Sequence, residues 1–172
     1  MNLPLTRSVV RSWHPSDAES LQRHADHGHV ARHLRDRFPH PYTMDHARGF
    51  LDWVSHQPSP SVWAIAVGDE AVGGIGIERH GDVERVSAEI GYWLGEAHWG
   101  RGVVTEALVA VTEWVFEQYD LTRLFAVPFA DHVASIRVLE KAGYVREGVM
   151  RQSAIKDGVI RDQALYARYK PL

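Results

Sequence analysis

Trp99-Gly100-Arg101-Gly102-Val103-Val104-Thr105-Glu106-Ala107 joins a strand-like run to a helix, and the rest of the chain is organised around this junction. Past the two glycines, apolar residues recur at the spacing of one helix face: Val104, Ala107, Leu108, Val111 and Val115. The sequence therefore predicts a helix that packs through this face, with its first turn pointing outward.

Glycines placed directly before a helix predict a binding site for an anion. The first backbone N–H groups of a helix have no partner within it, and the helix dipole adds a partial positive charge there. Gly100 and Gly102 let the backbone approach a phosphate closely. The loop has no Gly-Lys-Ser/Thr ending, so it is not a nucleotide-triphosphate loop, and it does not match Gly-x-Gly-x-x-Gly. A tight turn before a core helix is the alternative interpretation.

Length and composition predict one globular domain that spans residues 1–172. The chain is 45% hydrophobic and 24% charged. A net charge of −3 disfavours a nucleic-acid binder, and the lack of cysteine excludes disulfides and a thiol nucleophile. No apolar run approaches about 20 residues and no signal-peptide pattern is present, so we expect a cytoplasmic protein that does not bind a membrane.

The first part of the chain predicts a strand and two helices. Leu3–Trp13 is the expected strand, and a helix is expected from Pro15 to about His27. A second amphipathic helix is capped by Thr43 and stops before Pro58.

Four histidines lie close together in this part: His24, His27, His29 and His33. Their spacing suggests a metal site, but no set of carboxylates and histidines stands at an established motif spacing. We therefore expect a solvated helix face and no metal.

The middle of the chain predicts three strands. Ser61–Val67 and Glu70–Glu78 form a hairpin through a type II′ turn at Gly68-Asp69. Glycines at 73, 74 and 76 predict either a bulge or another group that closely approaches this strand. In residues 86–94 apolar side chains alternate with the rest, which places Glu89 on the opposite face, beside Gly91.

The last part of the chain predicts a strand, a helix and a hairpin. The strand is Arg123–Phe129, and Asp131 is the expected N-cap of the following helix, whose apolar positions are Ala134, Val138, Leu139 and Ala142. Gly143 is placed to end that helix in a left-handed turn. Tyr144–Ile155 and Val159–Tyr169 flank an Asp157-Gly158 type I′ turn. This order of elements predicts a mixed α/β (α+β) sheet with helices on its faces.

Three ordered motifs, Glu89–Leu94, His98–Ala107 and Ala134–Tyr144, resemble the GNAT superfamily of acyl-CoA N-acyltransferases. Within it the chain most resembles the branch of ribosomal-protein N-terminal alanine/serine acetyltransferases. The likeness covers nearly the whole chain, to a closing Arg161-Asp162. It implies a single GNAT-like domain with a twisted, mostly antiparallel mixed sheet of about seven strands and helices on both faces. It also implies an acetyl-CoA-dependent N-acetyltransferase that acts on a primary amine.

The resemblance assigns most of the cofactor contacts to the glycine loop. The family segment Gln/Arg-x-x-Gly-x-Gly/Ala, which binds the CoA pyrophosphate, corresponds to Trp99-Gly100-Arg101-Gly102-Val103-Val104. Here Trp99 replaces a polar residue and Val104 a small one. We expect binding to survive both changes, because backbone N–H groups from Arg101 to Thr105 supply most contacts. Backbone groups of Trp93 and Leu94 are expected to border the thioester.

Two residues are the candidate catalytic groups. Glu89 occupies the position where family members keep a glutamate as general base; the alternative is a structural glutamate that pairs with Arg85 or faces solvent. Ser135 matches the proton donor for the leaving thiolate; the alternative is a serine that satisfies backbone groups in the first turn of a helix. His132 stands where the family has an asparagine that contacts pantetheine, so a cofactor contact there is an open question.

The acceptor is left open between a protein N-terminus and a small amine, such as a polyamine or an antibiotic-like molecule, because the fold does not decide between them. Five aromatic residues either line an acceptor pocket or belong to the core: Trp13, Phe38, Tyr42, Trp93 and Trp99. A non-catalytic CoA-binding or interaction module is the competing class, and a homodimer is left open.

Overall fold

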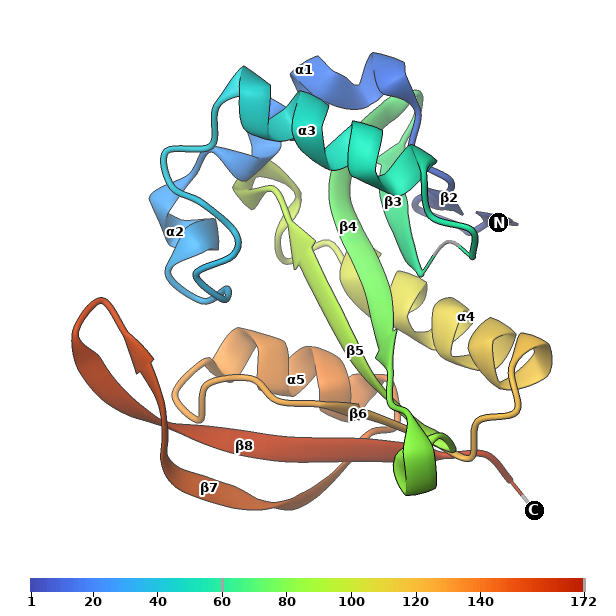
Figure 1. Cartoon of the computed structure of the whole chain (residues 1–172), viewed down its shortest axis with the longest axis vertical. Helices are drawn as coiled ribbons and strands as arrows, with labels where there is room; N and C mark the ends of the chain where they lie inside the picture. The colour runs from blue at the N-terminus through green and yellow to red at the C-terminus, as the bar shows by residue number, and fades with distance from the viewer. Residues whose placement is uncertain (60, 172) are drawn as a thin grey trace. The chain divides into compact units, whose positions relative to one another are not determined.

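The computed structural model of the chain describes residues 1–59 and 61–171. Figure 1 shows its elements in chain order. The strands in these residues are β1 (Asn2–Pro4), β2 (Val9–Arg11), β3 (Val62–Val67), β4 (Glu70–Arg79), β5 (Ser87–Leu94), β6 (Arg123–Ala126), β7 (Val145–Lys156) and β8 (Val159–Tyr169). The helices are α1 (Ala18–Ala25), α2 (Gly28–Ala31), α3 (Met44–Ser55), α4 (Val103–Gln118) and α5 (Val133–Lys141), with 3-10 turns η1 (Pro15–Asp17), η2 (Asp82–Glu84) and η3 (Glu96–His98).

The strands form one sheet in the order β1-β2-β3-β4-β5-β6-β8-β7. Strands β5 and β6 pair in parallel, whereas β1–β2, β2–β3, β3–β4, β6–β8 and β7–β8 are antiparallel. A parallel pair needs a crossover connection, and α4 supplies it. The predicted mixed, mostly antiparallel sheet is confirmed, with eight strands in the described residues instead of about seven.

The prediction of one strand over Leu3–Trp13 is wrong. This segment forms the hairpin of β1 and β2, and between them the Leu5 N–H donates to the Ser8 carbonyl at 2.9 Å. The chain turns back here because the next backbone N–H groups are bound by the Glu106 carboxylate, which lies on α4. The extra strand in the sheet results from this turn.

The chain divides into two compact units. Residues 1–76 and 92–107 form unit 1, and residues 77–91 with the chain from 108 onward form unit 2. Strands β4 and β5 and helix α4 continue from one unit into the other. The single domain inferred from length stays a prediction. Within the described residues, no helix is both long and apolar enough to span a membrane.

Unit 1 has a core built from helices α1 and α3, the aromatic residues Trp13 and Tyr42, and strands β3 and β4. The buried members are Trp13, Leu21, Ala25, Tyr42, Ala47, Leu51, Val54, Ala64 and Ala71. The predicted cap of α3 is confirmed, since Thr43 Oγ1 accepts a hydrogen bond from the His46 N–H at 3.3 Å. The close approach predicted at the β4 glycines is also confirmed. A β-carbon on Gly73 would lie 2.5 Å from the carbonyl oxygen of Trp93.

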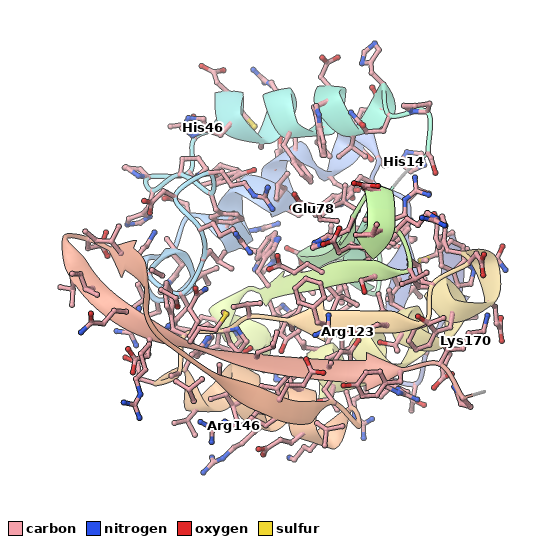
Figure 2. The ribbon with its side chains drawn as sticks, turned by 60° about the horizontal axis from the view of Figure 1, so that its bottom comes forward. His14, His46, Glu78, Arg123, Arg146 and Lys170 are labelled. Atoms are coloured by element: carbon pink, nitrogen blue, oxygen red, sulfur yellow. The ribbon has the colours of Figure 1, made fainter. Side chains whose placement is uncertain are left out.

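Unit 2 contains the β7–β8 hairpin, drawn in orange to red in Figure 1. Its predicted turn is confirmed, because Asp157 and Gly158 have φ values of +50° and +77°. Arg123 at the start of β6, labelled in Figure 2, lies 4.7 Å from the centre of the Phe125 ring and pairs with Glu147. The pair with Glu147 joins the beginning of β6 to β7.

Three details of the predicted segment from 123 to 143 differ in the structure. Strand β6 ends at Ala126 rather than at residue 129, because Pro128 has no N–H to continue a ladder. The N-cap of α5 is His132 and not Asp131, whose carboxylate pairs instead with Arg161. Ala134 is exposed, whereas Leu139 and Ala142 are buried as expected. The left-handed end of the helix is confirmed at Gly143, with φ +81°.

Candidate active site

The glycine loop has the backbone conformation of an anion-binding turn. Gly100 and Gly102 have φ values of +72° and +78°, and Arg101 between them does not have a positive φ. Alternation of this kind turns successive N–H groups toward one point, which forms a concave site for an anion. A β-carbon on Gly100 would meet nothing within 4 Å, so glycine is needed there for its φ and not for lack of space.

Helix α4 begins directly after this loop. Its first i→i−4 hydrogen bond runs from the Glu106 N–H to the Gly102 carbonyl, at 3.0 Å. The N–H groups of Val103, Val104 and Thr105 therefore lie ahead of the helical ladder, at the positive end of the helix dipole. Val103 is buried and Val104 only half-buried, so the predicted apolar face is displaced by one residue at its start.

Trp99 closes the turn between β5 and the loop. Its indole N–H donates to the Leu94 carbonyl at 2.7 Å, and its backbone N–H donates to Glu96 at 3.1 Å. The Gly95 N–H, in turn, donates to the Val72 carbonyl at 2.8 Å. The indole N–H holds the end of β5, which gives a structural reason for tryptophan at a position where the sequence resemblance implies a polar residue.

Arg7 is a cationic neighbour of the loop that sequence reasoning missed. It lies in the β1–β2 turn, and its Nε would be 3.8 Å from a β-carbon on Gly102. Its guanidinium pairs with Glu106 at 3.8 Å, and its side chain is 55% exposed, so a bound anion can also reach it from solvent. Nothing in the local sequence around Arg7 signals this position, because the contact depends on how the hairpin packs.

Glu106 anchors the hairpin turn to α4. Its two carboxylate oxygens accept hydrogen bonds from the N–H groups of Thr6 and Arg7, each at 3.0 Å. Burial opposes ionisation of Glu106, but these backbone hydrogen bonds outweigh it and lower the pKa of the carboxyl below its ordinary 4.5. The charged form of Glu106 therefore stabilises the folded state.

We expect Glu106→Gln to lower the melting temperature at pH 7 by about 2–4 °C. Hydrogen bonds to charged groups contribute about 1.5–3 kcal/mol to stability. Because this contact is partly exposed, we expect the variant to lose about 1 kcal/mol of unfolding free energy, which corresponds to that change in melting temperature for a chain of this size. The pKa is lowered in the folded state, so this stability is present above the unfolded pKa and is lost as the pH falls through the folded pKa. Thermal melts of the variant and the wild type at pH 7 and pH 3 check this. An equal difference in melting temperature between the two proteins at both pH values would contradict it.

Glu89 lies in unit 2, where the parallel ladder ends. The register pairs of β5 with β6 run from Ser87–Arg123 to Glu89–Phe125, and β5 continues to Leu94. Glu89 is half-buried, and a β-carbon on Gly91 would meet nothing within 4 Å. The predicted open space beside Glu89 on its face of the strand is therefore present.

His80 is a second titratable residue in this part of unit 2. Its ring packs edge-on against Phe125, the register partner of Glu89, with 5.3 Å between the ring centres. Its backbone N–H donates to Ser87 at 3.1 Å. No pattern in the sequence points to His80, because it follows the end of β4 and contacts β6 only in the folded sheet.

Ser135 is in the first turn of α5 and is half-buried. The segment that leads to it is braced by β8. The Ala130 N–H donates to Asp162 at 2.9 Å, and the guanidinium of Arg161 lies 3.8 Å from the centre of the Phe129 ring. The closing Arg161-Asp162 pair thus positions the start of α5. His132 is the N-cap of α5 and makes no side-chain cap hydrogen bond.

The aromatic residues proposed for an acceptor pocket fall into two groups. Trp13 and Tyr42 are buried core residues, and burial raises the pKa of Tyr42 to about 12. Phe38 and Trp93 are half-buried and pack edge-on with 5.5 Å between ring centres, while Trp99 is 45% exposed. Trp13 and Tyr42 are therefore core residues, as the alternative interpretation of the sequence expected.

The fold and the loop define a class of protein. A parallel β5–α4–β6 crossover places a glycine turn and a free helix N-terminus at the carboxyl end of β5, which is where α/β folds bind phosphate-bearing ligands. Glu89 lies on the same strand. These features define a mixed-sheet α/β protein with a backbone site suited to a phosphate-bearing ligand.

Comparison with known proteins identifies the family. The family model for the acetyltransferase (GNAT) domain matches residues 7–145. The uncharacterized N-acetyltransferase p20 of Bacillus licheniformis is 31% identical over 170 residues, which cover 95% of this chain and 93% of that protein. This chain belongs to the GNAT family of acetyltransferases. The predicted family is confirmed.

Other relatives include ribosomal-protein acetyltransferases. The ribosomal-protein-serine acetyltransferase of Escherichia coli is 33% identical over 125 residues, 73% of this chain. The chain spans about half to two thirds of the lengths of that enzyme and of YoaA and YjcK of Bacillus subtilis (64%, 62% and 47%). The structure of RimL, a ribosomal L7/L12 alpha-N-protein acetyltransferase in complex with coenzyme A, has the same fold, with a TM-score of 0.86, 22% identity and 98% coverage of both chains.

Proposed function

We propose that this chain transfers an acetyl group from acetyl-CoA to a primary amine, and that the amine is a protein N-terminus. The observation that carries the proposal is the loop of left-handed Gly100 and Gly102 at the start of α4. Its N–H groups, together with the guanidinium groups of Arg7 and Arg101, suit the pyrophosphate of CoA. The likeness to ribosomal-protein acetyltransferases supports the choice of acceptor.

The reaction requires two proton transfers, and unit 2 supplies a candidate for each. The amine nitrogen forms a bond to the thioester carbonyl carbon, and the carbon–sulfur bond breaks. Glu89 takes the proton from the attacking amine. Ser135 donates a proton to the leaving thiolate. We assign both residues to this reaction because their motifs resemble those of the family.

Release of free CoA with a panel of acceptors tests the proposal. Short peptides that begin with alanine or serine and carry a free amino terminus should release CoA faster than the same peptides with an acetylated amino terminus. Polyamines and aminoglycosides form the second arm. If only these small amines react, the proposal that the acceptor is a protein N-terminus is wrong. If nothing in the panel releases CoA while acetyl-CoA still binds, the chain is the non-catalytic module.

We expect Ser135→Ala to lower turnover by about tenfold or more and to leave acetyl-CoA affinity nearly unchanged, because a proton donor acts mainly as the thiolate leaves. Steady-state kinetics and a calorimetric titration measure the two effects. Ser55→Ala, an exposed serine at the end of α3, is the matched control. A tenfold loss of affinity with unchanged turnover would instead make Ser135 a binding residue.

A further inference from the structure

Two histidines and a glutamate meet on the surface of unit 1. His27 is the N-cap of α2, His29 lies in the first turn of that helix, and Glu96 begins η3. The Nδ1 of His27 is 2.8 Å from Glu96 Oε2, and the Nδ1 of His29 is 3.1 Å from both carboxylate oxygens. One donor atom from each of the three residues lies within 4.8 Å of the other two.

This geometry fits a transition-metal ion. Around a tetrahedral Zn²⁺ with bonds of about 2.0–2.2 Å, neighbouring ligand atoms lie roughly 3.3–3.6 Å apart. The carboxylate–imidazole distances of 2.8 and 3.1 Å are shorter than the lower end of that spacing by about 0.5 and about 0.2 Å, so small side-chain movements would admit the ion. Two imidazoles and one carboxylate form a ligand set that zinc uses in proteins, with the fourth position left to water.

Backbone hydrogen bonds hold the turn that carries Glu96 without the ion. The turn that carries Glu96 is fixed by the Gly95 N–H bond to Val72 at 2.8 Å and by the Trp99 N–H bond to Glu96 itself at 3.1 Å. Gly95 also packs against His24, since a β-carbon there would lie 2.6 Å from Nδ1 of His24. A site whose ligands are held before binding loses less entropy when the ion enters.

The three side chains are accessible, and their neighbours are engaged elsewhere. The exposed fractions of the His27, His29 and Glu96 side chains are 49%, 56% and 37%. The adjacent His24 bonds to Glu70 at 2.8 Å, and Glu70 also pairs with Arg23 at 2.7 Å. An ion can therefore reach the trio from solvent.

We infer that His27, His29 and Glu96 bind a divalent transition-metal ion of the Zn²⁺ type. The sequence alone disfavoured this site because no set of carboxylates and histidines stands at an established motif spacing, whereas the fold brings Glu96 to His29 from 67 residues away. Glu96 begins the turn that leads into the glycine loop, so the ion joins α2 to that turn.

Zinc titration of metal-free protein without a polyhistidine tag tests the site. We expect one Zn²⁺ per chain by calorimetry, and a visible absorption band for bound Co²⁺ that is stronger than that of the hydrated ion. Glu96→Gln and His29→Ala should each weaken Zn²⁺ affinity at least about tenfold, since even residues that only orient a ligand contribute about 10–100-fold. His56→Ala is the matched control, because His56 is an exposed histidine at the end of α3 that contacts Asp52 and Ser55.

Glu96→Gln separates the metal site from a plain hydrogen-bonded trio. Glutamine keeps the size of the side chain and an oxygen that accepts from the imidazoles, but it is a far weaker ligand. Unchanged Zn²⁺ affinity in Glu96→Gln, or equal weakening in His56→Ala, overturns the inference. So does wild-type protein that shows no saturable Zn²⁺ binding and no Co²⁺ band. Circular dichroism of each variant verifies that it is folded.

Discussion

Gly102→Glu is expected to reduce acetyl-CoA affinity by roughly 100-fold or more, to the limit of detection of a calorimetric titration. The glutamate brings bulk and a negative charge to the point where the loop and the start of α4 meet a pyrophosphate. It also occupies a φ of +78°, which costs a non-glycine residue about 1–2 kcal/mol. Its carboxylate can reach the Arg7 guanidinium, whose Nε lies 3.8 Å from the β-carbon position, and so removes a cation from the site.

Gly68→Glu separates the effect on binding from the backbone strain. Gly68 has φ +60° in the β3–β4 turn, and a β-carbon there meets nothing within 4 Å. The two variants therefore carry the same charge and comparable strain, but only one alters the glycine loop. We expect Gly68→Glu to bind acetyl-CoA like the wild type. If Gly102→Glu and the wild type bind acetyl-CoA with equal affinity while both proteins are folded, the proposal that this loop binds the pyrophosphate is wrong.

Glu89→Gln should lower turnover at neutral pH by about 10²–10⁴-fold, the usual contribution of a general base. Glutamine keeps the shape of the half-buried side chain at the last β5–β6 register pair and removes only its basicity. Raising the pH should restore part of the activity, because an amine already deprotonated by solvent needs no base. The measurement is turnover against pH for the variant and the wild type.

Two further variants make this result specific. Glu84→Gln changes an exposed carboxylate in η2, earlier in the same unit, and should leave the pH profile unchanged. His80→Gln tests the imidazole that packs on Phe125. If the Glu89→Gln and wild-type profiles superimpose while both proteins stay folded, the base is not Glu89. If His80→Gln instead loses turnover by the same factor and with the same pH dependence, His80 is the general base.

The sequence by itself determined the features that depend on residues near one another in the chain. The alternation through β5, the Thr43 cap, the Asp157-Gly158 turn and the left-handed Gly143 all follow from spacing and backbone preference over a few residues. The motif from Trp99 to Ala107 likewise predicted the loop and helix α4, and the ordered motifs identified the family. Errors within this local range were small, such as the cap of α5 at His132 instead of Asp131.

Only the tertiary structure decided which distant groups meet. Thr6 and Glu106 are 100 residues apart, and their hydrogen bond divides the expected first strand into β1 and β2. The side chain of Arg7 reaches the glycine loop for the same reason, and Glu96 completes a set of metal ligands with His27 and His29. Each contact joins polar groups whose own sequence neighbourhoods are unremarkable. The packing of elements far apart in the chain determines which groups become partners. The residues around each group in the sequence therefore do not predict its partner.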